Sequence, residues 1–312
     1  MVKFKNILAG LLSIFLLFII PGPVFSALED FDLSEAIIDI STLRGGGPAK
    51  DGIPAISKPK FVSAKEALFL KDKDMVIGVL IGKEAKAYPI NILNWHEIVN
   101  DSILNKEISV TWCPLTRSGI VFNRRTKKGV VDFGVSGLLY NSNLVMYDRP
   151  SDSLWPQLSL GAVTGAFVNQ KLTILPSLIT TWTDWRKRHP HTLVLSDETG
   201  FSRDYKRDPY SAYHASQEMM FSLSDIDRRL PAKSLVLGIK IQGIAKAYPI
   251  SSITEKPVSF YDSIGDKRIK VHIGFNNTAY VTDTRGNILP AIRAYWFAWS
   301  SFNKDTLIFT SE

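Results

Sequence analysis

The sequence lacks most of the patterns that identify common enzyme classes. Its 312 residues include one cysteine, Cys113, so an internal disulfide bond is excluded. Cys-x-x-Cys and His-x-x-x-His spacings are absent, which excludes a local zinc motif. The P-loop, Gly-x-Gly-x-x-Gly, Gly-x-Ser-x-Gly and His-Glu-x-x-His patterns are absent as well, so the usual nucleotide-binding, hydrolase and zinc-protease signatures do not apply. A hydrophobic content of 45% excludes a disordered chain.

Long apolar runs are confined to the start of the chain. Lys3 and Lys5 precede an apolar stretch at 7–20, and a cleavage position follows at Ala27. This layout predicts a secretory signal peptide at 1–26, and therefore an exported protein that is periplasmic or extracellular. An apolar helix of this length spans about 21 Å, short of the ~30 Å bilayer core, so a retained anchor is the weaker alternative. We expect no stable transmembrane span after removal of the signal.

The charge pattern argues against nucleic acid as a partner. The net charge is +7, and residues 1–26 carry two lysines and no acid, which leaves 7 − 2 = +5 for the remainder. The basic pairs are scattered and do not form a block, as on an ordinary solvated surface. Export also separates the protein from nucleic acid. A small polar ligand or a component of the cell envelope is the partner that we expect.

Two segments of the chain recur in the same order. The hexapeptide at 85–90, Ala-Lys-Ala-Tyr-Pro-Ile, is repeated without change at 245–250, an offset of 245 − 85 = 160 residues. A pattern of Leu-Pro, two tryptophans and Thr-Leu starts at 175 and again at 289, an offset of 289 − 175 = 114 residues. The order predicts an internal duplication, with 160 − 114 = 46 extra residues in the first copy. We therefore expect a strand-rich α+β fold, with two related units packed into one pseudo-symmetric globule.

The predicted boundaries follow from these repeats. Ser63 and Glu66 form a capping box that predicts one short helix near 64–71. Further helices are expected at 90–99 and 180–187. The chain is divided into the signal peptide at 1–26, an N-terminal lead-in with the short helix at 27–74, a first unit at 75–197 with the insertion and the candidate site, a polar connector at 198–233, and a second unit at 234–311.

Cys113 and His96 are the candidate catalytic residues. Cys113 ends an expected strand immediately before Pro114, where its thiolate could act as a nucleophile or a soft metal ligand if Arg117 or His96 lowered its pKa. The alternative is a buried thiol that acts as a small hydrophobe. His96 lies on the expected helix at 90–99, and its alternative role is a hydrogen-bonded structural histidine. These two residues with a distant histidine would resemble a copper ligand set, but the sequence identifies no metal and no cofactor.

Two polar stretches contain the candidate ligand-binding residues. The first runs from Gly134 to Gln157 and overlaps the expected insertion, and the second runs from Thr199 to Tyr210. Loops of this composition bind polar ligands, and they equally form hairpin turns and salt-bridged surface turns. The candidate ligand-binding residues are Tyr140, Asn143, Asp148, Arg149, Arg203 and Asp204.

Several long motifs resemble the domain of unknown function 3179 family. They are the segments 94–101 and 111–115, the segment 136–149 from Ser136 to Arg149, and the stretch from Thr181 to Tyr205. The likeness covers about 60–310. It implies an exported protein of bacterial or archaeal type, without an established activity, with a shared site around His96, Cys113 and 140–149. The usual family motif is Cys-Pro-Leu-Cys, and here Thr116 replaces the second cysteine, which counts against a dithiol redox role or a two-thiolate metal site.

Together these observations predict an exported protein of unknown activity with a ligand or metal cleft around His96 and Cys113. A thiol- or metal-dependent enzyme is one form of this hypothesis. The alternative is a non-enzymatic envelope protein that recognises a glycan or another protein through its polar loops.

Overall fold

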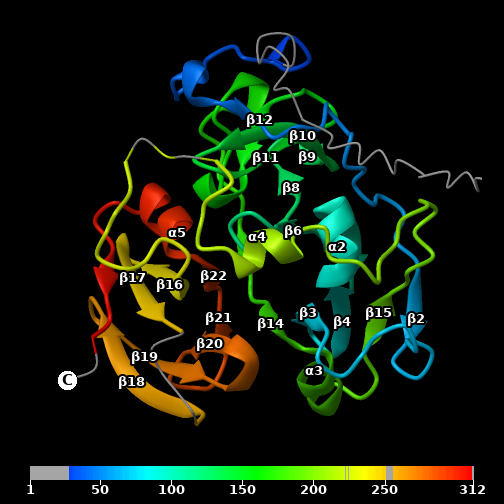
Figure 1. Cartoon of the computed structure of the whole chain (residues 1–312), viewed down its shortest axis with the longest axis vertical. Coiled ribbons are helices and arrows are strands. Elements are labelled where there is room, and N and C mark those ends of the chain that lie inside the picture. Colours follow the sequence, from blue (N-terminus) through cyan, green and yellow to red (C-terminus); the bar gives the residue numbers. More distant parts are fainter. Residues whose placement is uncertain (1–27, 222, 224, 251–255, 311–312) are drawn as a thin grey trace, which may run out of the picture.

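The computed structural model describes residues 28–221, 223, 225–250 and 256–310. In this part of the chain, five β-sheets are arranged around a common centre as a five-bladed β-propeller (Figure 1). The described α-helices are short, with five to seven residues each, and none is long and apolar enough to cross a membrane. The predicted signal peptide lies outside the described residues.

The first and second blades contain the candidate catalytic residues. The first blade has the strand order β14 (Leu178–Thr181), β3 (Met75–Ile81), β4 (Glu84–Pro89), β15 (Leu193–Leu195) and β2 (Phe61–Ser63). The second blade has the order β13 (Ile174–Leu175), β7 (Ser118–Asn123), β6 (Lys106–Cys113) and β5 (Ile98–Ile103). Helix α2 (Ile90–His96) connects β4 to β5, and α3 (Trp182–Arg188) connects β14 to β15. The chain therefore leaves the first blade to build the second and returns to complete the first.

Most of the third blade is inserted in the sequence between β7 and β13 of the second blade, and β1 comes earlier. Its strands are β1 (Arg44–Gly45), β10 (Phe133–Tyr140), β11 (Asn143–Asp148) and β12 (Leu154–Pro156). A small hairpin of β8 (Arg125–Thr126) and β9 (Gly129–Val130) precedes β10, and two 3-10 turns, η2 (Gln157–Ser159) and η3 (Gly165–Phe167), follow β12. The predicted insertion therefore forms most of a blade of its own.

The fourth and fifth blades complete the ring. The fourth has the order β22 (Ile292–Tyr295), β16 (Leu235–Ile241), β17 (Ile244–Pro249) and β23 (Leu307–Ile308), with α5 (Trp296–Phe302) between β22 and β23. The fifth has the order β18 (Val258–Ile264), β19 (Lys267–Ile273), β20 (Ala279–Thr282) and β21 (Ile288–Leu289), with the turn η4 (Phe275–Asn277) before β20. Helix α4 (Ser211–Ala215) lies in the segment that connects the first blade to the fourth, and it crosses the middle of the view in Figure 1.

The prediction of an α+β globule built from two duplicated units is wrong. Each expected unit contributes two sheets, and the insertion contributes the fifth, so the molecule is a ring of blades and has no two-unit division. The expected helix at 64–71 is also wrong. The side chain of Glu66 does accept a hydrogen bond from the Ser63 N–H at 2.9 Å, but the chain forms successive turns there, and Ala67 and Leu70 pack into the first blade. The predicted domain boundaries stay a prediction.

The repeated hexapeptide makes the same contact twice. In the first blade, Lys86 Nζ and the Tyr88 hydroxyl both donate to Asp101 Oδ2 on β5, at 2.7 and 2.6 Å. In the fourth blade, the Tyr248 hydroxyl donates to Asp262 Oδ2 on β18 at 2.7 Å, and Lys246 Nζ lies 2.6 Å from the same oxygen. The Lys and Tyr of each copy thus attach one blade to the first strand of the next.

The repeated tryptophan pattern also has one structural role in two places. Trp185 lies against Gly78, where an added Cβ would come within 2.3 Å of the ring, and its indole N–H donates to Thr192 at 2.9 Å. Trp299 lies in the same way against Gly238 and donates to Thr306 at 2.9 Å. Each tryptophan therefore closes its blade over a strand glycine.

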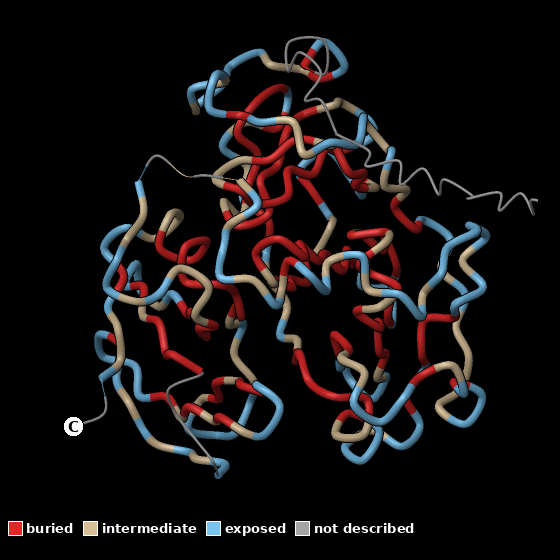
Figure 2. Tube along the Cα trace, viewed as in Figure 1, coloured by how far each residue is buried: buried red, intermediate tan, exposed pale blue. Residues whose placement is uncertain are grey.

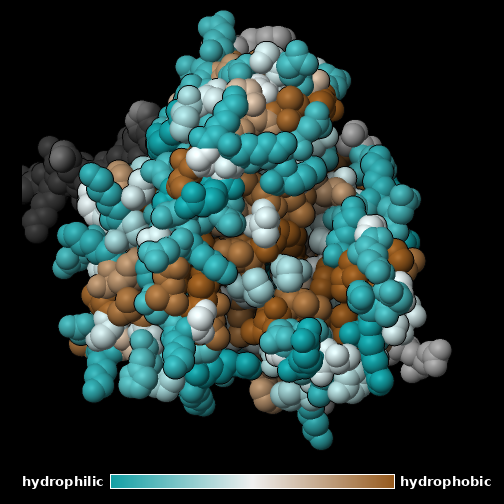
Figure 3. Space-filling model, turned by 180° about the vertical axis from the view of Figure 1, so that it is seen from behind, coloured by the Kyte–Doolittle hydropathy of each residue, from teal (hydrophilic) through white to brown (hydrophobic). Residues whose placement is uncertain are grey.

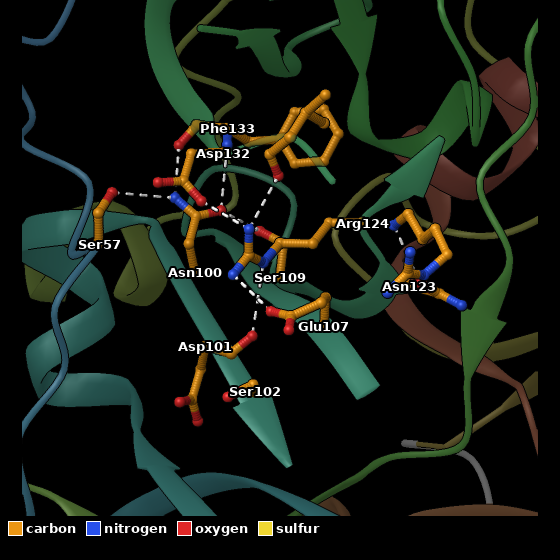
Figure 4. A network of polar contacts seen from close by, with 12 residues as sticks. Ser57, Asn100, Asp101, Ser102, Glu107, Ser109, Asn123, Arg124, Asp132 and Phe133 are labelled. Carbon is orange, nitrogen blue, oxygen red and sulfur yellow. Dashed lines mark hydrogen bonds and ion pairs between the residues drawn. The ribbon is translucent and has the colours of Figure 1, made fainter. Parts of the chain in front are cut away.

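Side-chain contacts join the third blade to the second (Figure 4). The Asn100 side chain donates to the Phe133 carbonyl at 2.8 Å and accepts from the Phe133 N–H at 3.1 Å, so it pairs with the backbone as another strand would. Arg124 forms ion pairs with Glu107 at 2.8 Å and with Asp132 at 2.7 Å. These contacts hold β10 against β5.

The central strands are mostly buried and many connecting loops are exposed, whereas β18 of the fifth blade is largely half-buried or exposed (Figure 2). Seen from behind, apolar side chains gather across the middle of the molecule and polar ones surround them (Figure 3). Polar side chains that are nevertheless buried are the informative exceptions, because burial of a polar group is costly unless it has a partner.

Candidate functional site

A polar hollow of about 280 Å³ opens beside α4, and we refer to it as the α4 hollow. Four segments of the chain form its wall: the stretch at 69–75, α2, the end of β6 with the turn that follows it, and the chain at 205–214. Its polar and aromatic lining residues include Asn91, Asn94, Trp112, Arg117, Tyr205, Asp208 and His214, and Lys71, Lys73, Lys206 and Asp74 also contribute. The hollow thus collects groups that can bind a polar molecule.

Hydrogen bonds hold one wall of the hollow in place. The Trp112 indole N–H donates to Asn94 Oδ1 at 2.7 Å, and Asn94 Nδ2 donates to Asp208 Oδ1 at 3.0 Å. The same Asp208 oxygen accepts from the Tyr210 N–H at 2.9 Å. A strand, a helix and a loop are therefore fixed relative to one another before any ligand binds, as a preformed site requires.

His214 presents one ring nitrogen toward Asp208. Its Nε2 lies 3.0 Å from the Pro114 carbonyl, which can only accept, so Nε2 carries a proton. Its Nδ1 lies 3.6 Å from Asp208 Oδ2. Burial is the main cause of a lowered pKa for His214, and the charge of Arg117 lowers it further, although the contact with the Pro114 carbonyl raises it. The imidazole is therefore neutral at pH 7 with Nδ1 as an acceptor.

Arg117 lies at the bend between β6 and β7 in a strained conformation. Its φ is +50°, in the left-handed region that non-glycine residues rarely adopt. Its Nε is buried and has no hydrogen-bond partner among the described residues. Strained backbone and an unsatisfied buried donor both cost free energy, and such costs are concentrated at binding sites.

His96 lies next to the hollow and is neutral. Its Nδ1 donates to the Pro54 carbonyl at 2.7 Å, so its Nε2 accepts from the Tyr205 hydroxyl at 2.7 Å. The Thr199 hydroxyl lies 2.5 Å from the Tyr205 hydroxyl and completes the chain of hydrogen bonds. Burial lowers the pKa of His96, and the charge of Arg203 acts in the same direction. The ring is thus held at both nitrogens.

Cys113 is buried, with 1% of its surface exposed. Burial, together with the negative charge of Glu97, raises the pKa of the thiol to about 11, although Thr116 forms a hydrogen bond with the sulfur that lowers it. The thiol is therefore protonated at neutral pH. The groups that contact or act on the sulfur are Thr116, Leu144 and Glu97, and His96 is not one of them. No three His, Cys, Asp or Glu side chains in the described part of the chain form a metal-ligand group. Catalysis by Cys113 and His96 stays a prediction.

Glu97 is a residue that the sequence reasoning missed. It ends α2 with φ +57° and is buried, and burial raises the pKa of its carboxyl to about 8. Its charge raises the pKa values of both Cys113 and Tyr210, whose own burial is the larger cause. Its position next to His96 in the sequence could have identified Glu97 as a site residue. A glutamate at the end of a helix is, however, ordinarily a surface residue.

Three of the predicted ligand-binding residues lie in the third blade, away from the α4 hollow. Asn143 is fully buried and donates to Thr116, Ser118 and Gln157, which joins the second and third blades. Asp148 accepts from Ser151 and from the Trp155 indole N–H, so it closes the turn between β11 and β12. Tyr140 packs against Phe302 at 5.7 Å and lines a different hollow.

The remaining predicted ligand-binding residues lie at two separate places. Arg149 forms a two-pronged ion pair with Asp51, 3.0 Å on each side, and contacts the Tyr147 hydroxyl. Arg203 and Asp204 are exposed on the loop that contains Tyr205. The structure therefore does not gather the six residues in one cleft, and a ligand-binding role for them stays a prediction.

The comparisons with known proteins identify a family but no reaction. A comparison with curated proteins found no match, and neither did a comparison with solved structures. A family model matches residues 50–287, which is 238 of the 312 residues and includes β2 to β20 and the whole α4 hollow. The chain belongs to the family described as "Protein of unknown function (DUF3179)".

Proposed function

We propose that the chain is an exported protein that binds a small polar ligand in the α4 hollow. The observation that carries the proposal is the convergence of Asn94, Arg117, Asp208 and His214 on one hollow from three distant segments. These side chains offer hydrogen-bond donors and acceptors, and they carry charges of both signs. Hydrogen bonds between the side chains and to the backbone hold several of them in place. Such preorganisation reduces the entropy cost of binding.

The test is native mass spectrometry of protein released from its own cell envelope. We expect a bound small molecule in the wild-type protein and its loss in Lys73→Trp, because the new ring would occupy the hollow from its exposed edge. Lys127→Trp, an equal change on the exposed β8–β9 hairpin, is the matched control and should retain the molecule. Equal retention by both variants would contradict the proposal.

Export is part of the proposal, and it is supported by the layout of residues 1–26. Cell fractionation should recover the protein outside the cytoplasm. N-terminal sequencing of that protein should begin at Ala27. Recovery of the uncut chain in the cytoplasm would contradict export.

Chemistry at Cys113 has weaker support than binding. The thiol is buried, and its pKa of about 11 leaves little thiolate at pH 7. A thiol-dependent enzyme would need a change of structure that exposes the sulfur. Binding needs no such change, and we therefore prefer it.

The alternative role, recognition of an envelope glycan, has one observation in its favour. The exposed face of the fifth blade has a hollow of about 490 Å³ lined by Tyr261, His272 and Tyr280. The last two rings stack at 4.5 Å with an 8° angle between their planes. Aromatic faces with nearby polar groups bind sugars. Tyr261→Ala should then abolish binding to isolated envelope glycan, whereas Phe275→Ala, another exposed aromatic of this blade, should not.

A further inference from the structure

Arg293 is a buried cation that has no counter-charge among the described residues. It lies on β22, and only 3% of its surface is exposed. The hydrogen bond of its side chain within the described part of the chain is a long one, from Nη1 to the Asn277 carbonyl at 3.4 Å. Its Nε and Nη2 are buried and have no partner among the described residues. A buried charge without a partner costs several kcal/mol, so a residue of this kind needs an explanation.

The neighbouring charge has the same sign. After burial itself, the charge of Arg117 is the largest influence that lowers the pKa of Arg293, to about 9. Arg117 is brought to β22 by the bend between β6 and β7, where the Tyr295 N–H donates to the Thr116 carbonyl at 2.8 Å. Arg117 Nε is also buried without a partner. Two guanidinium groups therefore approach each other, and each has an unused donor.

A third cation lies close to this pair. Lys233 Nζ is over the ring of Tyr213 at 3.7 Å and over the ring of Tyr295 at 5.4 Å, and it donates to backbone carbonyls. Burial lowers the pKa of Lys233, and the charge of Arg117 lowers it further. No carboxylate in the described part of the chain forms an ion pair with Arg117, Arg293 or Lys233. The positive charge here is therefore not neutralised by the protein.

The route to Arg117 is also positive. The basic residues that line the α4 hollow are Arg117, Lys71, Lys73 and Lys206, and the acidic ones are Asp74 and Asp208. The net charge of the lining is therefore +4 − 2 = +2. A concave site with excess charge of one sign concentrates ligands of the opposite sign. The planar fork of N–H donors in a guanidinium matches the oxygens of a carboxylate or a phosphate.

We propose that Arg117, which lines the α4 hollow, and Arg293, which lies behind it on β22, together bind a small oxyanion, either a free phosphate or a carboxylate of the ligand. The inference rests on the proposed binding function and names the chemical class of its ligand. The anion accepts hydrogen bonds from the unused Nε and Nη2 donors and separates the two like charges.

Isothermal titration with inorganic phosphate and with malonate, in a buffer without other oxyanions, tests the inference. We expect saturable binding of at least one of the two, which also identifies the source of the charge. Arg293→Gln and Arg117→Gln should each weaken this binding at least tenfold. Arg186→Gln, an exposed arginine paired with Asp72, is the matched control and should bind as the wild type does.

Thermal melts separate an anion site from a structural arginine. Without anion, Arg293→Gln should melt at or above the wild-type temperature, because the substitution removes an unpaired buried charge. Added anion should raise the melting temperature of the wild type and leave that of Arg293→Gln unchanged. Equal anion binding by wild type and variant, or a wild-type melting temperature that added anion does not raise, would overturn the inference.

Arg117→Gln keeps the test decisive if Arg293→Gln does not fold, because Arg117 is only partly buried. Failure of this inference is distinguishable from failure of the proposed function. A neutral molecule found by native mass spectrometry, with no binding of phosphate or malonate, would refute the oxyanion and leave the ligand hollow intact. Absence of any bound molecule, with no effect of Lys73→Trp, would refute the hollow.

Discussion

Glu97 is a buried acid whose ionisation is disfavoured in the folded state. Burial raises the pKa of its carboxyl from the ordinary 4.5 to about 8. A folded-state pKa above the unfolded value contributes stability that is complete below pH 4.5 and is lost as the pH rises through 8, because the folded protein retains a proton that the unfolded chain releases. The carboxyl next to Cys113 is therefore neutral in the folded protein at pH 7.

We expect Glu97→Gln to remove this pH dependence. The stability of the wild type relative to the variant should fall by up to ~1.4 kcal/mol per pH unit between pH 5 and pH 8. Urea denaturation at several pH values measures it. Glu198→Gln, whose side chain is 80% exposed, is the control and should follow the wild type. A constant difference between wild type and Glu97→Gln would show that Glu97 titrates normally.

We expect Cys113 to resist alkylation in the folded protein. Its thiol is buried and carries a raised pKa of about 11, so iodoacetamide at pH 8 meets neither an accessible sulfur nor a thiolate. Mass spectrometry should find one label only after denaturation. A Ser202→Cys variant, altered at an exposed loop position, should gain a label under native conditions. Rapid labelling of Cys113 in the folded wild type would contradict the burial described above.

The sequence motifs name some residues that lie near the α4 hollow, and the site roles inferred from them stay a prediction. His96 and Trp112 came from the motifs that the family shares, and both lie at or next to the α4 hollow. Asn143 and Asp148 have the composition of ligand-binding residues, yet their polar atoms are used within the fold. Arg293 had no sequence signal, because its importance depends on the absence of a buried counter-charge, and only three-dimensional packing can reveal that.

At the scale of elements, the Lys-x-Tyr pairs of β4 and β17 fasten neighbouring blades with unequal burial. The Lys86–Asp101 pair has side chains that are 10% and 9% exposed, against 16% and 17% for Lys246–Asp262. Removal of one partner from a buried ion pair costs about 3–5 kcal/mol, because the other charge stays buried, and the cost falls with exposure.

We therefore expect Asp101→Asn to destabilise the protein by about 3 kcal/mol or more, and Asp262→Asn by less. Urea denaturation of both variants measures the difference. Asp266→Asn, which removes an exposed acid near the second pair, should cost less than about 0.5 kcal/mol. A larger loss for Asp262→Asn than for Asp101→Asn would contradict the argument from burial.

Elements were predictable where local signals and packing agree. The turn at Gly82, with φ +59°, and the helix that starts after Pro89 both follow from the sequence. The capping box at Ser63 led to the wrong prediction of a helix at 64–71. Its hydrogen bond stabilises a single turn, whereas a stable helix needs several turns with an apolar face that packs against the core. Tertiary burial of Ala67 and Leu70 decided the outcome.

At the scale of the whole molecule, the number of blades could not be read from the repeats. Both hexapeptides lie in corresponding strands, β4 and β17, but the residues between β7 and β13 give no repeat that would identify them as a blade. The ladder of β10 and β11 also contains a bulge between Val135 and Leu139. The third blade therefore depends on contacts with its neighbour, of which Asn100 is the central one.

We expect Asn100→Ala to loosen the third blade as a unit. The substitution leaves the N–H and the carbonyl of Phe133 without their side-chain partner, at a cost of about 2–4 kcal/mol. Hydrogen exchange should accelerate most in β10 and β11. Asn123→Ala, a less buried change in the same network, is the control and should have a smaller effect (Figure 4). Uniform acceleration in all five blades would contradict a local joint.

The nested order of the strands has a consequence for synthesis. β3 ends at Ile81 and its partner β14 begins at Leu178, so 178 − 81 − 1 = 96 residues emerge from the ribosome between them. During that interval one edge of β3 has no hydrogen-bonding neighbour, and an unpaired edge invites association with other chains. We therefore expect the nascent chain to be most prone to association until about residue 181, when β14 becomes available to pair with β3.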